Sequence, residues 1–123
     1  MPVPDYQTLM LPLLRRLGSA ATATAVRDHV ESVADEFGLS ETERAQRIPS
    51  GQENLLTNRL HWARTYLGKA RLTHSPKRGL VEITDRGRAI LAENPQSITN
   101  STLARFPEFI EWTKAVPAKS GER

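Results

Sequence analysis

The chain has 123 residues, of which 38% are hydrophobic and 25% charged, and its net charge is +3. This length suits one domain, and no apolar run approaches the roughly 20 residues that a membrane-spanning helix needs. The lack of cysteine excludes disulfides, thiol nucleophiles and cysteine-based zinc sites. Residues 1–14 contain three prolines and no basic leader, which argues against a signal peptide, so we expect a cytoplasmic protein.

Positive charge is concentrated in one part of the chain. Between Arg59 and Arg88, eight lysines and arginines stand against two carboxylates, whereas the remaining residues carry a net negative charge. A block of this kind suggests a polyanionic partner. A solvated basic surface without a partner explains the same charge, so the distribution alone leaves both alternatives open.

Apolar spacing predicts two helices near the start of the chain. The first runs from Tyr6 to Leu17, with Asp5 as its N-cap and Pro12 inside it, where we expect a kink or a later start. Small residues from 19 to 24 suit a short strand. The second helix is predicted from Ala25 to Phe37, where a glycine follows and ends it.

Two capping boxes predict the next helices. The box at residues 40–43 opens a short helix that ends near Ile48, and the box at residues 50–53 opens a helix from Glu53 to Lys69. Leucines and alanines in the longer helix repeat at spacings of four and three and form a core seam. Two aromatic residues flank this seam, and we interpret both as core rather than as stacking platforms: Trp62 and Tyr66.

A strand, a tight turn and a second strand follow at residues 72–75, 76–79 and 80–84, which predicts a β-hairpin with a basic tip. Thr84 caps a helix from Asp85 to Glu93.

The remainder is predicted as a polar linker from Gln96 to Asn100 and a terminal helix from Leu103 to Ala115, interrupted at Pro107. We therefore expect three parts: a recognition domain at residues 1–95, a linker with a C-terminal helix at residues 96–117, and a disordered tail at residues 118–123.

The predicted fold class is mainly α with a small β-hairpin, in an order typical of a winged helix-turn-helix. In that fold the second helix of the pair enters the major groove of double-stranded DNA, and the hairpin, or wing, lies along the flanking backbone or in the minor groove.

The candidate DNA-binding residues fall into three groups. Backbone amides at the predicted helix start favour a phosphate, as at Ser50, Gly51 and Gln52. The polar face of the helix offers side chains for base edges or phosphates, namely Asn54, Thr57, Asn58, His61, Arg64 and Thr65. Long cations at the wing tip suit phosphates or the minor groove, as in Lys77 and Arg78. An ordinary surface role is the alternative for each of them.

No catalytic set stands out. The three histidines lack metal-ligand spacing, no serine lies in a nucleophile elbow, and no glycine-rich phosphate loop is present. We therefore expect a chain without a catalytic centre, a metal or a cofactor.

Four segments in this order resemble the N-terminal domain of Mrr-type restriction endonucleases. They lie at residues 48–52, 58–63, 75–79 and 83–87, and the resemblance extends over roughly residues 2–95. Two positions depart from the family pattern, since Arg71 replaces a frequent glycine and Val81-Glu82 replaces a common aromatic residue.

The resemblance implies a winged-helix DNA-recognition domain that is joined, in the parent protein, to a C-terminal nuclease domain of the PD-(D/E)xK type. It also implies that the target is modified, for example methylated, DNA. Two other hypotheses stay open: a transcription regulator that dimerises through Phe106 to Trp112, and a winged helix that binds proteins only. The oligomeric state also stays open, as does whether the bases are read directly in the groove or after they are flipped out of the duplex.

Overall fold

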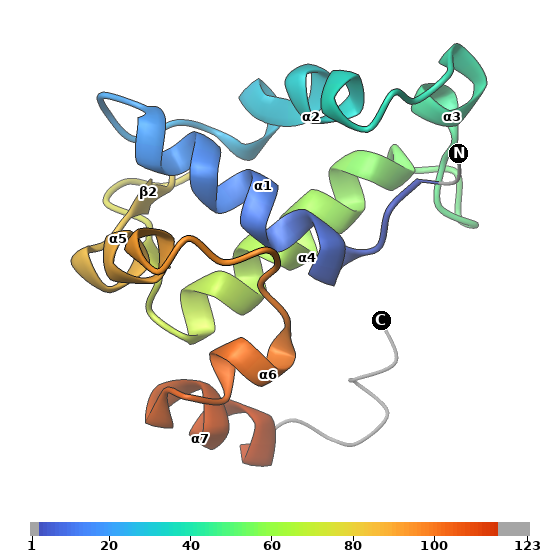
Figure 1. Ribbon diagram of the computed structural model, residues 1–123. Helices are drawn as coiled ribbons and strands as arrows, with labels where there is room; N and C mark the ends of the chain where they lie inside the picture. Colours follow the sequence, from blue (N-terminus) through green and yellow to red (C-terminus); the bar gives the residue numbers. More distant parts are fainter. Residues whose placement is uncertain (1–2, 116–123) are drawn as a thin grey trace.

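Helices predominate in the computed structural model, which describes residues 3–115 (Figure 1). In chain order the elements are α1 (Tyr6–Ser19), the 3₁₀ helix η1 (Val26–His29), α2 (Val30–Glu36), α3 (Glu41–Ala45), α4 (Leu55–Lys69), β1 (Thr73–His74), β2 (Glu82–Ile83), α5 (Asp85–Ala92), α6 (Asn100–Leu103) and α7 (Pro107–Ala115). The predicted fold class is confirmed. None of the helices in this part of the chain is long and apolar enough to cross a membrane.

The core forms where α1 packs against α4. These helices cross at the centre of Figure 1, with α2 and α3 above them and α6 and α7 below. The predicted seam of α4 is confirmed, because its leucines and alanines are buried: Leu56, Leu60, Ala63 and Leu67. Leu9, Leu13 and Leu14 of α1 are fully buried. Burial of each such leucine side chain contributes about 1.5–3 kcal/mol.

Three of the predicted helix caps are present. The Asp5 carboxylate accepts a 2.8 Å hydrogen bond from the Thr8 amide. Ser40 and Glu43 satisfy each other's amides, and the Thr84 hydroxyl accepts from the Gly87 amide. At Pro12 we expected either a kink or a later helix start. The later start is excluded, because α1 begins at Tyr6 and continues through Pro12.

The second predicted helix is divided in two. Ala25 has extended backbone and precedes η1, and α2 begins only at Val30. Gly38, with φ +63°, follows α2, as predicted. The short helix α3 ends at Ala45 rather than near Ile48.

The hairpin has a third short neighbour. β1 and β2 pair antiparallel, with Thr73 opposite Ile83. Thr24 pairs with Val81 through two backbone hydrogen bonds of 3.0 and 2.8 Å, so the predicted strand within residues 19–24 is a single bridge. This bridge joins the hairpin to the segment before η1 and completes a winged-helix-like arrangement, with the hairpin as the wing.

The chain after α5 packs on the same core. Ile98 is fully buried, and Asn100 donates hydrogen bonds to Gln7 and Tyr6, so the description of residues 96–100 as a mere polar linker was wrong. The terminal segment forms two helices, α6 and α7, because Pro107 opens the second. The tail predicted at 118–123 lies outside the described residues.

Candidate nucleic-acid interface

The start of α4 differs from the prediction. Asn54, not Ser50, is the N-cap, and its carboxamide oxygen accepts from the Thr57 amide at 3.1 Å. Asn54 also donates its side-chain N–H to the Arg44 carbonyl. The capping box predicted for Ser50 and Glu53 was therefore wrong, and Glu53 lies before the helix.

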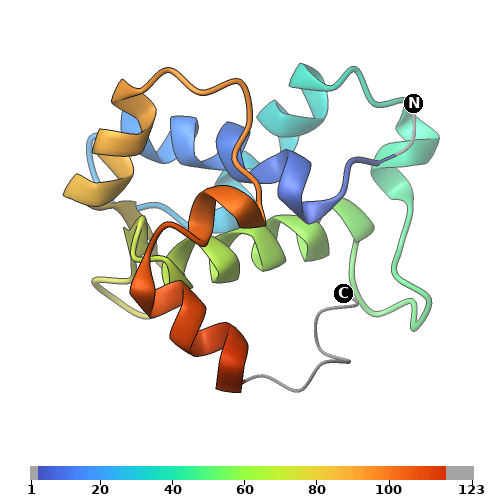
Figure 2. The same cartoon turned by 60° about the horizontal axis from the view of Figure 1, so that its bottom comes forward.

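The helix starts later than predicted because the two sides of the preceding loop are joined by backbone hydrogen bonds. The Ile48 amide donates to the Glu53 carbonyl at 3.0 Å, and the Leu55 amide donates to the Gln46 carbonyl at 2.8 Å. Ser50, Gly51 and Gln52 therefore form the exposed tip of a loop and cannot bind a phosphate at a helix start. Figure 2 shows this loop beyond one end of α4 and the hairpin beyond the other.

The polar face of α4 is half-buried, and parts of it already have partners. The Thr57 hydroxyl donates to Asn54, and the Thr65 hydroxyl donates to the His61 carbonyl at 3.0 Å. Asn58 donates its amide N–H to a Glu53 carboxylate oxygen at 3.1 Å, which leaves its carbonyl oxygen for other contacts.

His61 is held in its neutral form. Burial lowers its pKa below the ordinary 6.5, while the charge of Glu53 opposes the decrease and the charge of Arg64 adds to it. At neutral pH this imidazole therefore offers one donor and one acceptor rather than a positive charge.

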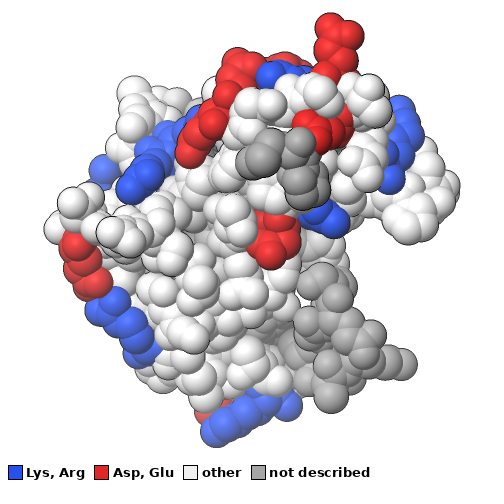
Figure 3. Space-filling model, turned by 45° about the vertical axis from the view of Figure 1, so that its right-hand side comes forward, with Lys and Arg blue, Asp and Glu red and all other residues white. Residues whose placement is uncertain are grey.

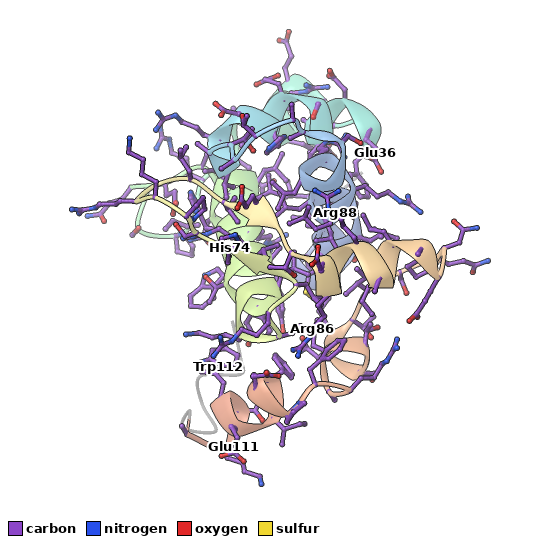
Figure 4. All side chains as sticks on the ribbon, turned by 90° about the vertical axis from the view of Figure 1, so that its left-hand side faces the viewer. Glu36, His74, Arg86, Arg88, Glu111 and Trp112 are labelled. Atoms are coloured by element: carbon purple, nitrogen blue, oxygen red, sulfur yellow. The ribbon has the colours of Figure 1, made fainter. Side chains whose placement is uncertain are left out.

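Two hollows lie between α4 and the hairpin, and together we call them the α4–hairpin trough. The smaller, of about 180 Å³, is lined by Ala25, Val26, Arg27, His61, Arg64, Gly79, Leu80 and Val81. The larger, of about 620 Å³, is lined by Arg64, Thr65, Gly68, Lys69, Arg71, Thr73, His74, Ser75, Val81, Glu108 and Trp112. Figure 4 labels two of these residues, His74 on β1 and Trp112 on α7.

Arg64 and Val81 line both hollows, so the polar face of α4 and the base of the hairpin lie side by side. Lys77 and Arg78 are exposed in the turn of the hairpin. Contact of any of these residues with DNA stays a prediction.

The cations of this surface differ from some of those elsewhere, although Arg47, Arg59 and Arg88 also form no ion pair within the described residues. Several arginines away from the trough form ion pairs, namely Arg16 with Glu36, Arg44 with Asp35, and Arg105 with Glu93. Within residues 3–115, no ion pair forms at the cations of the trough and wing tip, which are Arg27, Arg64, Lys69, Arg71, Lys77 and Arg78.

Carboxylates gather on another part of the molecule. Figure 3 shows them at the top of the view, over α2 and α3, while the middle of that face is largely free of charged side chains. The carboxylate that lines the trough, Glu108, is paired with Arg86 at 2.8 Å. The trough and wing tip therefore carry excess positive charge, which suits a polyanion.

Sequence reasoning missed three of these cations as site residues: Arg27, Lys69 and Arg71. The local excess of positive charge already included Lys69 and Arg71, whereas nothing in the sequence pointed to Arg27. Arg71 has φ +66°, a left-handed conformation that favours glycine. A backbone of this kind suits the glycine that the family resemblance led us to expect at this position.

The described helices, hairpin and basic trough define a winged-helix-like domain with a surface suited to nucleic acid. Residues 6–93 match the family model described as the Mrr N-terminal domain, and the chain belongs to this family.

The chain is also similar to the type IV methyl-directed restriction enzyme EcoKMrr of Escherichia coli (strain K12). The two are 38% identical over 99 residues, which cover 80% of this chain and 32% of that enzyme. The chain thus spans about a third of the length of this relative. No solved structure matches the chain.

Proposed function

We propose that this chain is the DNA-recognition module of a methyl-directed restriction system. It binds double-stranded DNA, with α4 in the major groove and the hairpin against the flanking backbone. The observation that carries the proposal is the α4–hairpin trough, where a polar helix face adjoins cations that form no ion pair within the described residues. Membership of the Mrr N-terminal domain family supports it.

We also propose that the module recognises DNA rather than cutting it, and that it acts in the cytoplasm beside a separate nuclease domain. The support for a separate nuclease domain is that the chain matches only 32% of a relative that is a restriction enzyme. The preference for methylated DNA is proposed because the same relative is a methyl-directed restriction enzyme. A buried methyl group is worth about 0.8 kcal/mol, or roughly fourfold in affinity, so strong selectivity needs further contacts.

The alternative of a regulator that dimerises through Phe106 to Trp112 has less support. α7 directs Phe109 into the core of its own chain, where it is 3% exposed. Trp112 meets the Tyr66 ring edge-on, with 5.1 Å between the ring centroids. These contacts engage the side chains that such a dimer would need.

The test is fluorescence anisotropy with labelled duplexes that are identical except for 5-methylcytosine, N6-methyladenine or no modification. We expect binding to all three, a steep fall in affinity with salt, and tighter binding to one modified duplex. Equal affinity for the three would remove the preference for methylated DNA. Absence of binding at low salt, with the protein folded, would remove the DNA-binding function.

Two variants separate the proposed roles of the wing and the helix. Lys77→Ala with Arg78→Ala is expected to weaken binding to all duplexes and to flatten the salt dependence, because it removes two phosphate contacts. Asn58→Ala is expected to change the sequence or modification preference. The reverse pattern would contradict the assigned positions of α4 and the hairpin.

A further inference from the structure

Arg64 is unusual among the half-buried arginines of residues 3–115. The other four have hydrogen bonds, since Arg16 reaches Ser32, Arg44 reaches Leu39, Arg59 reaches Val3 and Arg86 reaches Ala70. The Arg64 Nε is buried and has no hydrogen-bond partner, and no ion pair forms at its guanidinium. A buried donor without an acceptor is costly, so this position favours a ligand that supplies one.

The position of Arg64 limits what that ligand can be. Its side chain lines both hollows of the α4–hairpin trough, together with Val81 at the base of the wing. Arg27 lies on the side of the smaller hollow, and Lys69 and Arg71 line the larger. The ligand therefore meets Arg64 between the helix and the hairpin, where other cations are close.

On the proposed function, that place is occupied by a DNA strand. With α4 in the major groove and the hairpin against the flanking backbone, one sugar-phosphate strand runs between the two elements. The space between the two elements therefore faces phosphates, whereas base edges face the outer surface of the helix. A guanidinium suits a phosphate because its planar fork donates two parallel hydrogen bonds to an anion.

We propose that Arg64 binds one backbone phosphate of a DNA strand that runs through the α4–hairpin trough, with Arg27 on one side and Lys69 and Arg71 on the other. This inference rests on the proposed function and adds a defined phosphodiester site to it. Arg64 contributes affinity and register to every duplex rather than sequence or methyl preference.

The first test compares Arg64→Gln with Arg15→Gln. Arg15 is an exposed cation on α1 that lines neither hollow of the trough. We expect Arg64→Gln to weaken binding about tenfold on modified and unmodified duplexes alike and to reduce the salt slope by about 0.9, the value for one phosphate. Arg15→Gln is expected to change neither. An unchanged affinity and slope for Arg64→Gln would overturn the proposal.

The second test replaces single phosphates with neutral methylphosphonates along one strand. With the unsubstituted protein, a methylphosphonate at one position is expected to weaken binding about as much as Arg64→Gln does. With Arg64→Gln, the same position is expected to lose none, because the contact is already absent. If Arg64→Gln weakens binding only for one base sequence or one modification, Arg64 contacts a base edge and the phosphate assignment is wrong.

Folding and function are controlled separately. Arg64 has no hydrogen bond to lose within the described residues, so Arg64→Gln is expected to unfold at the same or a higher denaturant concentration. Arg64→Lys keeps the charge and is expected to retain the salt slope while losing part of the affinity. If the unsubstituted protein binds no duplex, the proposed function fails first. If the unsubstituted protein binds DNA, and if Lys77→Ala with Arg78→Ala weakens binding while Arg64→Gln does not, only the proposed phosphate site at Arg64 is wrong.

Discussion

Gly87 lies at a very close contact between α5 and the chain that precedes β1. A Cβ at Gly87 would overlap the Leu72 carbonyl oxygen and lie 2.7 Å from Ile83 Cγ1. Gly68 in α4 is different, because its nearest atom would be the Thr73 hydroxyl at 3.6 Å, an ordinary contact.

We therefore predict opposite effects for the two alanine substitutions. Gly87→Ala should lower the free energy of unfolding by about 1–3 kcal/mol, since the backbone of Leu72 must move. Gly68→Ala should raise it by about 1 kcal/mol, because alanine favours a helix interior more than glycine does. Urea unfolding of the two variants checks this, and shifts in the same direction would contradict it.

His61 makes stability depend on pH in a defined direction. Burial lowers its pKa in the folded protein below the ordinary 6.5. As the pH falls, the unfolded chain therefore binds a proton at this residue before the folded protein does. Its contribution to stability is complete above pH 6.5 and is lost as the pH falls through the folded pKa.

The corresponding measurement is an NMR titration of the imidazole carbon-bound protons, which should give a pKa for His61 below 6.5. His61→Gln should also reduce the loss of unfolding free energy between pH 7 and pH 5. Burial lowers the pKa of His29 as well, so part of the pH dependence should remain in this variant. A folded pKa at or above the ordinary value would refute the argument.

At the scale of elements, the start of α4 depends on Asn54. This side chain caps the helix through the Thr57 amide and holds the Arg44 carbonyl, so it joins α4 to the segment after α3. Asn54→Ala should therefore cost about 1 kcal/mol, and more if the Arg44 carbonyl is left without a donor.

Ser50→Ala is the matched control, because Ser50 lies at the exposed loop tip, where its hydroxyl accepts a long bond of 3.4 Å from the Gln52 amide. It should change the unfolding free energy by less than about 0.5 kcal/mol. The helical circular dichroism signal and the denaturation midpoint distinguish the two. A larger effect at Ser50 than at Asn54 would restore the capping box that the sequence suggested.

For the whole molecule, the chain after α5 is part of the same core as α1 and α4. Tyr66 of α4 contacts Tyr6 and Phe109, with ring centroids 4.5 and 6.0 Å away, and so connects α1 with α7. Ile98, in the segment between α5 and α6, is fully buried.

Ile98→Ala should consequently lower the unfolding free energy by about 2–5 kcal/mol, as expected for a buried isoleucine. Ser97→Ala, at an exposed neighbouring position, should leave it nearly unchanged. Thermal unfolding of both variants tests whether residues 96–100 act as core or as a linker. Equal midpoints would support the linker.

Local sequence signals predicted much of this protein. The core seam of α4 follows from periodicity, the hairpin from its turn residues and alternating strand pattern, and the caps at Asp5, Ser40 and Thr84 from interactions that span three residues. Such interactions form in the same way wherever the helix lies, so one chain carries enough information to place them. The family resemblance was confirmed by the match over residues 6–93.

Contacts between distant segments decided the rest. The loop that moves the start of α4 to Asn54 depends on pairing between residues 46–48 and 53–55. The segment after α5 depends on hydrogen bonds from Asn100 to Gln7 and Tyr6, 93 and 94 residues away. The same holds for Arg64, whose place on the polar face was predictable but whose buried Nε was not. The sequence alone determined most of the elements that form, because those rules are local, but not the division of the helix predicted from Ala25 to Phe37 or of the terminal helix. Only the tertiary structure decided which polar groups find partners, because that depends on what packs beside them.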